Sequence, residues 1–431
     1  MSLLVRLSLY FSAFLAHCFL PETLSNVLLI PLIKNKLKDS SRSDNYRPIA
    51  IATAASKVFE RALLNRLAPF LNSSDNQFGF KQQHSTELCI MALKEVVRYY
   101  FNLNTPVFIC FLDIKSAFDR ISYWLLLCKL HERGVPVYLL LLLKFWFSSQ
   151  QLYVRWGRAM SNGFTMSNGV RQGSVLSPLF FNVYVDEFSH ALNASNIGCH
   201  VANKPLNNFS YADDMALVCP SACALNRMLR LCEKLAVRHY ITYSVTKSEC
   251  MVVSPRSLCL TSPPSIYLNG SQLKYVNSFT YLGHIIVNEF YDDEDIRKEM
   301  RNLCARGNAI IRKFSFCNMD VKCSLYKTYC YPFYCGSLWT RFRVATMDKL
   351  KVMYNMVMRR LAGVPPWHSA RQMFVSLGVQ SFSERLRGLC HGARERARGS
   401  GNTMVQALVQ SDATAQSDLW HRWSLLLDLD R

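Results

Sequence analysis

Three aspartates occupy positions at which carboxylates could hold divalent metal. Asp113 ends the apolar run PVFICFLD, whose length and content of aromatic and β-branched residues predict a buried strand over 106–114. Asp213 and Asp214 lie between two further apolar runs, NFSYA and MALVC, which predict a strand, a turn and a strand. Side by side, such strand ends would offer oxygen ligands to two Mg²⁺ ions about 4 Å apart, the arrangement that phosphoryl or nucleotidyl transfer needs.

Each aspartate also has an ordinary structural explanation. Asp is common in turns, so Asp213 and Asp214 could simply close a hairpin, and Asp113 could simply end a strand. The surrounding sequence favours chemistry over these alternatives. The Asp pair lies between apolar segments of matched length, and an aromatic residue, Phe118, stands five residues after Asp113.

The elements expected around these residues form an α+β unit. Before it, residues 24–52 alternate short apolar runs with turn residues, and 53–101 contain two amphipathic helices. After 290 the pattern is helical and basic, with a break at Gly-Val-Pro-Pro, residues 363–366. Within the unit we expect a hairpin around 154–170, strands over 241–253 and 265–287, and helices over 122–131, 137–148, 177–192 and 221–239.

The charge of the chain points to a nucleic-acid partner. Its 431 residues include 50 Lys and Arg against 30 Asp and Glu, a net charge of +20. Residues 300–400 hold 18 basic and 4 acidic residues, so about +14 of this charge lies in one segment. We expect that segment to bind a phosphate backbone, with Arg359 and Arg360 among the contacts. A hydrophobic content of 50% is globular composition.

The sixteen cysteines show no pattern typical of disulfide frameworks or zinc sites. None forms a C-x-x-C pair, and most stand in apolar runs, as reduced core thiols do. The closest spacings, Cys219 with Cys223 and Cys330 with Cys335, lack further ligands at zinc-finger intervals. The sequence therefore predicts an intracellular protein, nuclear or cytoplasmic, with no zinc.

The N-terminal segment resembles a secretory signal only in part. MSLLVRLSLYFSAFLAHCFLPE has an early basic residue and an apolar stretch, but Arg6 interrupts that stretch and no small-residue cleavage site follows Leu20. We expect an amphipathic helix that is neither cleaved nor secreted. The apolar run at 135–147 is too short to span a bilayer, so no membrane partner is expected.

Several segments together resemble the reverse transcriptases of non-LTR (LINE-type) retrotransposons. FLDIKSAFDRI, NGVRQGSVLSPLFFNVYVDEF and YADDMALV match, in order and spacing, the A, B and C motifs of that family. Upstream, NVLLIPLIKNK, NYRPIAIATAASKVFERALLNRL and QFGFKQQHST are similar to its fingers motifs; downstream, SVTKSECMVV is similar to motif D and YVNSFTYLGHII to the motif after it. The resemblance covers roughly residues 20–400, and the combination is far more specific than YADD alone.

The resemblance implies a right-hand polymerase and an RNA-directed DNA polymerase activity. The expected parts are an N-terminal helix with fingers at 1–104, a palm with an antiparallel sheet at 105–287 and a helical, basic thumb with a C-terminal extension at 288–431. The implied partners are an RNA template, a DNA primer and dNTPs, with two Mg²⁺ ions, or Mn²⁺, as cofactors. The implied metal ligands are Asp113, Asp213, the assisting Asp214 and the backbone carbonyl of Ile114.

The resemblance also assigns roles to residues around the metals. Phe118 would lie beneath the incoming sugar as a steric gate, and Lys247 would protonate pyrophosphate. The residues that would contact the template base, the incoming nucleotide or its triphosphate are Gln172, Gly173, Arg47 and Lys81. Each could instead be structural, and Lys81 stands where many relatives have Arg. Asp119 and Asp186 are expected to be structural, as a helix cap and a surface carboxylate respectively.

Two other functions remain open on sequence alone. A two-metal nuclease would share the carboxylates but would have no use for Phe118 or the RQG segment. A catalytically inactive, RNA-binding descendant is also compatible, although the intact aspartates argue against it. Autonomous elements of this group usually carry an endonuclease and often Cys/His knuckles, and neither is expected here, so we expect a remnant or a fragment of such an element.

Overall fold

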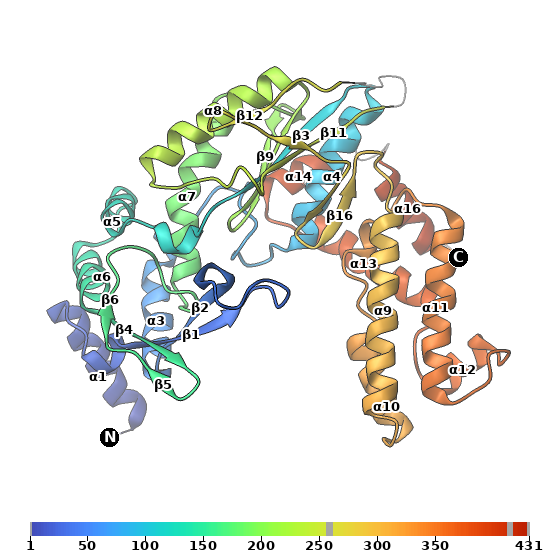
Figure 1. The fold of residues 1–431 in the computed structure, drawn as a ribbon, viewed down its shortest axis with the longest axis horizontal. Coiled ribbons are helices and arrows are strands. Elements are labelled where there is room, and N and C mark those ends of the chain that lie inside the picture. The colour runs from blue at the N-terminus through green and yellow to red at the C-terminus, as the bar shows by residue number, and fades with distance from the viewer. Residues whose placement is uncertain (1, 256–261, 412–416, 429–431) are drawn as a thin grey trace. The chain divides into compact units, whose positions relative to one another are not determined.

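A computed structural model describes residues 2–255, 262–411 and 417–428 (Figure 1). The chain divides into two compact units. Unit 1 contains Met1–Phe80, Leu112–Ser195 and Leu229–Lys247; unit 2 contains Lys81–Phe111, Asn196–Met228 and Ser248–Arg431. The predicted division at residues 104 and 287 stays a prediction.

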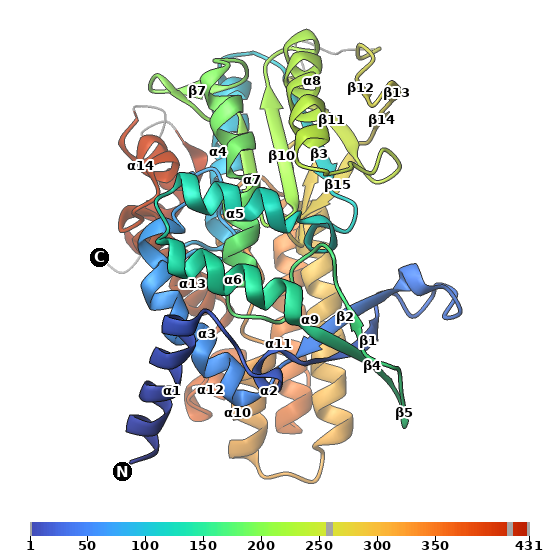
Figure 2. The same ribbon diagram turned by 90° about the vertical axis from the view of Figure 1, so that its left-hand side faces the viewer.

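Helix α7 (Ser177–Ala194) is buried along most of its length and forms part of the core of unit 1. Pro178 stands in its first turn, where a missing N–H costs nothing. Figure 2 shows α5 (Tyr123–Glu132) and α6 (Val137–Ser149) side by side. The other helices of the unit are α1 (Leu3–His17), α2 (Glu22–Ser25) and α3 (Ala54–Leu67), with 3₁₀ turns at Ser43–Asn45, Ala68–Phe70 and Ala117–Arg120.

A small sheet completes unit 1. β1 (Val27–Ile33) runs antiparallel to β2 (Tyr46–Ile51) and parallel to β4 (Gln151–Trp156). β5 (Ala159–Met160) and β6 (Phe164–Thr165) pair with β4, which confirms the expected hairpin near residue 154. Alternate residues of these strands face inward, and Val27, Leu29, Ala50 and Leu152 form a small core.

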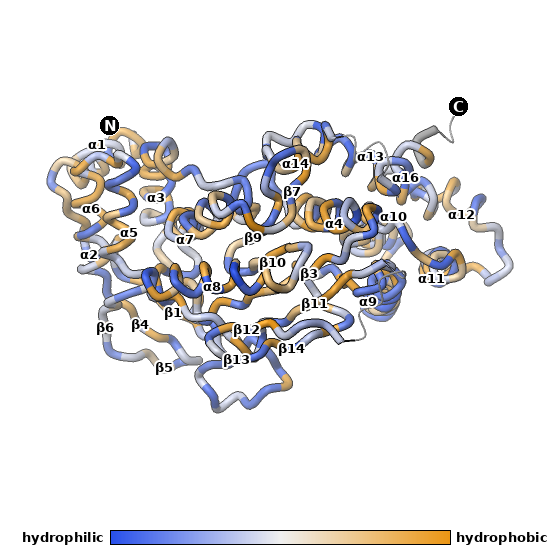
Figure 3. The backbone as a smooth tube through the Cα atoms, turned by 90° about the horizontal axis from the view of Figure 1, so that it is seen from above, coloured by the Kyte–Doolittle hydropathy of each residue, from blue (hydrophilic) through white to orange (hydrophobic). Residues whose placement is uncertain are grey.

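The main sheet of unit 2 has the order β14-β11-β3-β10-β9. β3 (Val107–Asp113), whose last two residues belong to unit 1, is central, and its first six residues are buried, as expected of a strand covered on both faces. Figure 3 shows hydrophobic stretches along β3, β10 and β11. The neighbouring strands are β9 (Asn208–Tyr211), β10 (Asp214–Cys219), β11 (Glu249–Val253) and β14 (Lys274–Tyr275), and α4 (Thr86–Asn102) packs against β9.

Two predicted strands are shorter than expected. In 241–253 only Glu249–Val253 is a strand, because a turn at 244–247 precedes it. The segment 265–287 splits where pairs of residues adopt positive φ, at Asn269–Gly270 and Leu282–Gly283, as two-residue hairpin loops require. The resulting hairpins are β12 (Tyr267–Leu268) with β13 (Ser271–Gln272) and β15 (Ser278–Tyr281) with β16 (His284–Val287).

The remainder of unit 2 is largely helical, as predicted. Its core gathers large aromatic side chains, among them Trp339, Tyr354 and Phe382. The expected break at 363–366 is confirmed, since α11 (Val344–Ala362) is followed by Gly363, a C-cap residue in the left-handed conformation. The elements are β7 (His200–Val201), β8 (Lys204–Pro205), α8 (Ala222–Arg238, which continues into unit 1), α9 (Asp293–Lys313), α10 (Met319–Tyr329), the 3₁₀ turn Gly336–Leu338, α11 (Val344–Ala362), α12 (Ala370–Ser376), α13 (Phe382–Arg398), α14 (Thr403–Gln410) and α16 (Asp418–Asp428).

A buried ionic network joins α4, β16 and α9 within unit 2. Lys94 of α4 donates to Asp292 at 2.5 Å, and His284 of β16 lies 3.0 Å from Asp295. Trp339 also donates to Asp295 at 2.8 Å. Burial alone would raise the pKa of Asp292, but the charges of Lys94 and His284 outweigh it and lower that pKa. The network therefore fixes the β15–β16 hairpin against two helices.

We predict that Lys94→Met destabilises the protein by about 3 to 5 kcal/mol, because it leaves the buried Asp292 carboxylate without its main counter-charge. Folding lowers the pKa of Asp292. The ionised Asp292 carboxylate therefore adds to the free energy of unfolding above its unfolded pKa near 3.8, and this stabilisation is lost as pH falls through the lower folded pKa. Urea unfolding over a pH series measures both effects.

The control for this prediction is an exposed ion pair between Arg42 and Asp44. Asp44→Asn should leave the free energy of unfolding almost unchanged, because water screens that pair. An equally small change for Lys94→Met would contradict the prediction.

Candidate functional site

Residues 242–244 fix the backbone around Asp113. Ile114 forms an isolated antiparallel bridge with Tyr243, and the Asp113 carbonyl accepts a hydrogen bond from the Ser244 N–H at 2.8 Å. The Lys115 N–H likewise donates to the Thr242 carbonyl, so the hydrogen bonds join the neighbours of Ile114 and Tyr243. In such a non-hydrogen-bonded pair the carbonyls of the two bridged residues point away from each other. The Ile114 carbonyl is therefore directed away from Tyr243, as a backbone ligand would need to be.

Lys247 lies beside Asp113. Its Nζ is 3.4 Å from Asp113 Oδ2, and both side chains belong to unit 1. The Lys247 side chain is 66% exposed, so solvent screens the pair and the contact is weak. The Lys247 side chain therefore lies near the Asp113 carboxylate and can still change its conformation.

Asp213 and Asp214 lie at the turn between β9 and β10. Tyr211 pairs with Asp214, so the loop between them contains only Ala212 and Asp213. Ala212 has a φ of +56°, a conformation that costs a non-glycine residue roughly 1 kcal/mol. The tight turn presents both carboxylates at one end of the sheet in unit 2, and β10 is the neighbour of β3 in that sheet.

Phe118 lies in the 3₁₀ turn Ala117–Arg120 and is half-buried. Its ring stacks on Phe181 of α7 with centroids 5.0 Å apart and meets Phe80 edge-on at 6.3 Å. Its carbonyl accepts a hydrogen bond from the Val170 N–H at 2.8 Å. The structure therefore places Phe118 in contact with the segment that precedes Gln172. These contacts are compatible with a steric gate and equally with a packing role.

Gln172 and Gly173 are anchored to β2. The Ala50 N–H donates to the Gln172 carbonyl at 2.7 Å. Gly173 has a φ of +115°, and a Cβ there would lie 2.7 Å from the Ala50 carbonyl oxygen. Only glycine fits both the conformation and the close backbone approach.

Comparison with known proteins decides the family. The family model described as "Reverse transcriptase (RNA-dependent DNA polymerase)" matches residues 34–286, more than half of the chain. The chain belongs to the reverse transcriptase family. Members of this family generally use divalent metal ions, and the match includes both strand ends that carry the predicted aspartates.

Relatives confirm the non-LTR resemblance. The RNA-directed DNA polymerase from mobile element jockey of Drosophila funebris is 24% identical over 423 residues, covering 94% of this chain and 45% of the relative. The probable RNA-directed DNA polymerase from transposon X-element of Drosophila melanogaster is 24% identical over 352 residues, covering 78% of this chain and 37% of the relative. The chain thus spans less than half the length of these relatives.

Among solved structures, apo telomerase from Candida tropicalis is similar to this chain. The two are 10% identical, with a TM-score of 0.49, and the match covers 93% of this chain and 67% of the other.

Glu60, a residue that the sequence did not point to, contacts the segment around Gln172 and Gly173. Its carboxylate comes from α3, is fully buried, and accepts hydrogen bonds from Ser174 Oγ at 2.6 Å and from the N–H groups of Val175 and Leu176. Arg171 is its charge partner at 3.4 Å. In the sequence Glu60 is one polar residue of an amphipathic helix, so only its long-range contacts identify it.

Arg47 and Lys81 fall in different units. Arg47 is exposed on β2, opposite Leu32, and Lys81 belongs to a turn at the beginning of unit 2. Their predicted grip on the triphosphate stays a prediction.

Two expectations about structural aspartates were wrong. Asp186 is not a surface carboxylate: its side chain is 4% exposed and pairs with Arg133 at 2.5 Å, because α7 is buried on most sides. Asp119 does not cap a helix, since Ser116 occupies the N-cap position of the 3₁₀ turn and Asp119 lies inside it.

In the part of the chain that the structure describes, no group of three or more His, Cys, Asp or Glu side chains is arranged to hold a metal ion. Asp113 belongs to unit 1 and the Asp213–Asp214 pair to unit 2, so a metal centre formed by all three stays a proposal. Within the described ranges, no helix combines the length and apolar character needed to cross a bilayer.

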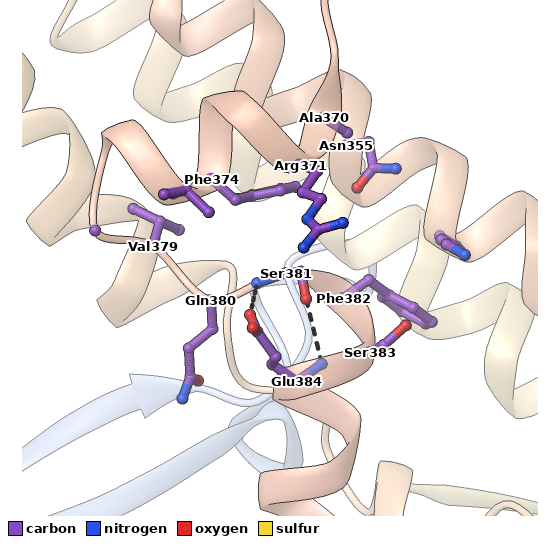
Figure 4. Close-up of a pocket in the computed structure, with 13 residues that line it drawn as sticks. Asn355, Ala370, Arg371, Phe374, Val379, Gln380, Ser381, Phe382, Ser383 and Glu384 are labelled. Atoms are coloured by element: carbon purple, nitrogen blue, oxygen red, sulfur yellow. Dashed lines mark hydrogen bonds between the residues drawn. The ribbon is translucent and has the colours of Figure 1, made fainter. Parts of the chain in front are cut away.

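A groove of about 830 Å³ lies in the helical part of unit 2 (Figure 4). It is bordered by α11, α12 and the beginning of α13, and its cations are Lys351 and Arg371. The acidic residue Glu384 also lines it, but its carboxylate accepts a hydrogen bond from the Ser381 N–H at 2.7 Å in a capping box. None of the predicted site residues lines this groove.

The contact between Gly173 and Ala50 yields a stability prediction. Gly173→Ala should cost more than the roughly 1 kcal/mol expected for a positive φ alone, because the new Cβ would clash with the Ala50 carbonyl. Gly157→Ala is the matched control, since Gly157 has a φ of +60° and no heavy atom within 4 Å of its Cβ position. Urea unfolding compares the two, and equal costs would contradict the anchoring of Gly173 on β2.

Proposed function

We propose that this chain is the polymerase part of a retrotransposon protein and extends a primer 3′-hydroxyl with dNTPs on an RNA template. The strand order carries the proposal: β3, which ends in Asp113, is the neighbour of β10, which begins at Asp214. This topology would set three carboxylates at one end of the sheet. Because the chain spans 45% of its jockey relative, the activity is proposed for this part alone.

The donor set fits divalent metal. Carboxylate and carbonyl oxygens are the hard ligands that Mg²⁺ and Mn²⁺ prefer, and Asp113, Asp213, Asp214 and the Ile114 carbonyl would supply them. When bound, such ions would supply a lower pKa for the attacking hydroxyl and charge neutralisation for the leaving pyrophosphate. Lys247, already beside Asp113, would donate a proton to pyrophosphate.

The nucleotide would be positioned by residues around the 171–176 segment. Gln172 and Gly173 would contact the template base and the incoming nucleotide, and Phe118 would lie beneath its sugar. Arg47 and Lys81 would bind the triphosphate through charge. Positioning of this kind, rather than covalent chemistry by the protein, accounts for most of the rate that such a site can supply.

The basic helical segment would bind the template and primer backbone. Arg359 and Arg360 are poor probes of this, because Arg359 donates to the His368 carbonyl at 3.1 Å and Arg360 to Asn308 at 3.4 Å. Lys351 and Arg371 border the open groove and are better candidates for phosphate contact.

We also propose that the reaction takes place in the nucleus or cytoplasm. Cysteines in the described residues are free thiols, and ten of them are buried. Free thiols and nucleic-acid substrates both suit a reducing compartment.

The metal assignment predicts that Asp113→Asn or Asp213→Asn lowers primer extension on an RNA template roughly a thousandfold, since losing a metal ligand costs several kcal/mol of transition-state stabilisation. Template binding should change by no more than a few fold. Asp119→Asn, at an exposed position in the 3₁₀ turn after Asp113, is the control and should extend normally. Extension by both Asn variants at the wild-type rate would refute the assignment.

The steric-gate assignment predicts that Phe118→Ala admits rNTPs, lowering the ratio of kcat/KM for dGTP over GTP opposite cytosine. A ring that serves only packing would instead cost ~3 to 5 kcal/mol of stability and lower activity with both substrates alike. Phe188→Ala, which removes a fully buried ring of α7, is the control for a pure loss of packing. An unchanged ratio would assign Phe118 to packing.

The groove assignment predicts that Lys351→Glu with Arg371→Glu weakens RNA binding regardless of sequence. The slope of log affinity against log salt should become shallower by roughly 0.7 to 0.9 for each phosphate that the protein no longer neutralises. The control for net charge is the double variant Arg42→Glu with Arg238→Glu. Both arginines lie outside the groove and pair with carboxylates. Equal slopes for the two double variants would place the nucleic-acid track elsewhere.

A further inference from the structure

We infer that Glu60 is a positioning residue that sets the place of Gln172 and Gly173 and thereby the affinity for the incoming dNTP. The inference rests on the proposed function and adds a residue outside the predicted site. It follows from what the Glu60 carboxylate contacts within unit 1.

The Glu60 carboxylate binds the backbone at the start of α7. The N-cap residue of α7 is Leu176, which offers no side-chain hydrogen bond to the first turn. Glu60 Oε2 instead accepts from the Val175 N–H, from the Leu176 N–H at 3.3 Å and from Ser174 Oγ at 2.6 Å. Negative charge at a helix N-terminus is favoured by the helix dipole, and N–H groups buried there need an acceptor.

A buried charge pair holds the other end of the same segment. Arg171 is buried, lies 3.4 Å from Glu60 Oε1, and places its guanidinium over the Trp146 ring at 4.9 Å. Burial lowers the pKa of Arg171, while the Glu60 charge opposes that change. The segment 171–176 therefore depends on one carboxylate for both its charge balance and its backbone hydrogen bonds.

Gln172 and Gly173 lie between these contacts and a second anchor on Ala50. Arg171 and Ser174 flank them and both bind Glu60, while Ala50 donates to the Gln172 carbonyl at 2.7 Å. Ala50 and Glu60 come from consecutive elements, β2 and α3. Weakening the Glu60 contacts would leave the segment with its hydrogen bond to Ala50 and the Arg171 contact with Trp146, without its charged acceptor. Small displacements of a positioning group cost binding and rate.

The test is Glu60→Gln, which keeps the shape of the side chain but replaces one acceptor oxygen by an NH₂ group. All three hydrogen bonds from Ser174, Val175 and Leu176 go to Oε2, so the amide oxygen of Gln can take that place only as a neutral, weaker acceptor. Its NH₂ group then faces the buried Arg171 guanidinium, which loses its counter-charge. We expect the dNTP KM in single-nucleotide incorporation to rise about tenfold while kcat falls no more than about threefold. Should Glu60→Gln lack a cooperative unfolding transition, Ser174→Ala removes one of the same hydrogen bonds and should raise KM in the same direction by a smaller factor.

Asp186→Asn is the matched control. Asp186 is another buried carboxylate of unit 1, paired with Arg133 and bonded to the Ser74 N–H, but it has no contact with the 171–176 segment in any hydrogen bond or ion pair of the described residues. It should lower stability and leave the dNTP KM unchanged. An equal KM for Glu60→Gln and wild type, or an equal rise in Asp186→Asn, would overturn the inference.

Amide hydrogen exchange separates this inference from the proposed function. In Glu60→Gln the amides of Val175 and Leu176 should exchange at least about tenfold faster than in wild type, with no such change in Asp186→Asn. If wild type incorporates no nucleotide, the proposed function fails and the role in dNTP affinity fails with it, while the exchange result still decides whether Glu60 anchors the segment. Unchanged exchange would overturn the anchoring.

Discussion

The burial of β3 is the constraint on which the rest of the structure depends. Six apolar residues of this strand are covered on both faces, so the chain can expose a carboxylate only where the strand ends, at Asp113. β11 pairs with β3 from Val107 to Phe111, and β10 is the next strand of the sheet and begins at the turn that carries Asp213 and Asp214. The proposed arrangement of three carboxylates thus rests on ordinary sheet topology.

Buried carboxylates elsewhere hold the surrounding elements rather than perform chemistry. Glu60 binds the 171–176 segment, Asp186 binds Arg133, and Asp292 binds Lys94. Each has a cationic partner, because an unpaired buried charge would cost several kcal/mol. Since each of these pairs uses one acidic and one basic residue, they leave the net charge of +20 unchanged.

The sequence predicted elements well and long-range contacts poorly. The strand at 106–114, the helices over 122–148 and the turn at Asp213 follow from local periodicity and turn chemistry, and the structure confirms them. The role of Glu60 and the burial of Asp186 depend on residues more than fifty positions away, which no local pattern encodes. The prediction of one strand over 265–287 was wrong, although the Asn269–Gly270 dipeptide is a local signal for the first hairpin turn in that range.

The most direct test of the account is whether Asp113 and Asp213 share one metal centre. Mn²⁺ binding would be measured by electron paramagnetic resonance in complexes with RNA template, a primer that lacks its 3′-hydroxyl and a dNTP. The account predicts that Asp113→Asn and Asp213→Asn each weaken Mn²⁺ binding and that the double variant is no weaker than the single ones, the non-additivity expected of a shared site. Unaltered binding in the single variants, or strictly additive losses, would contradict it.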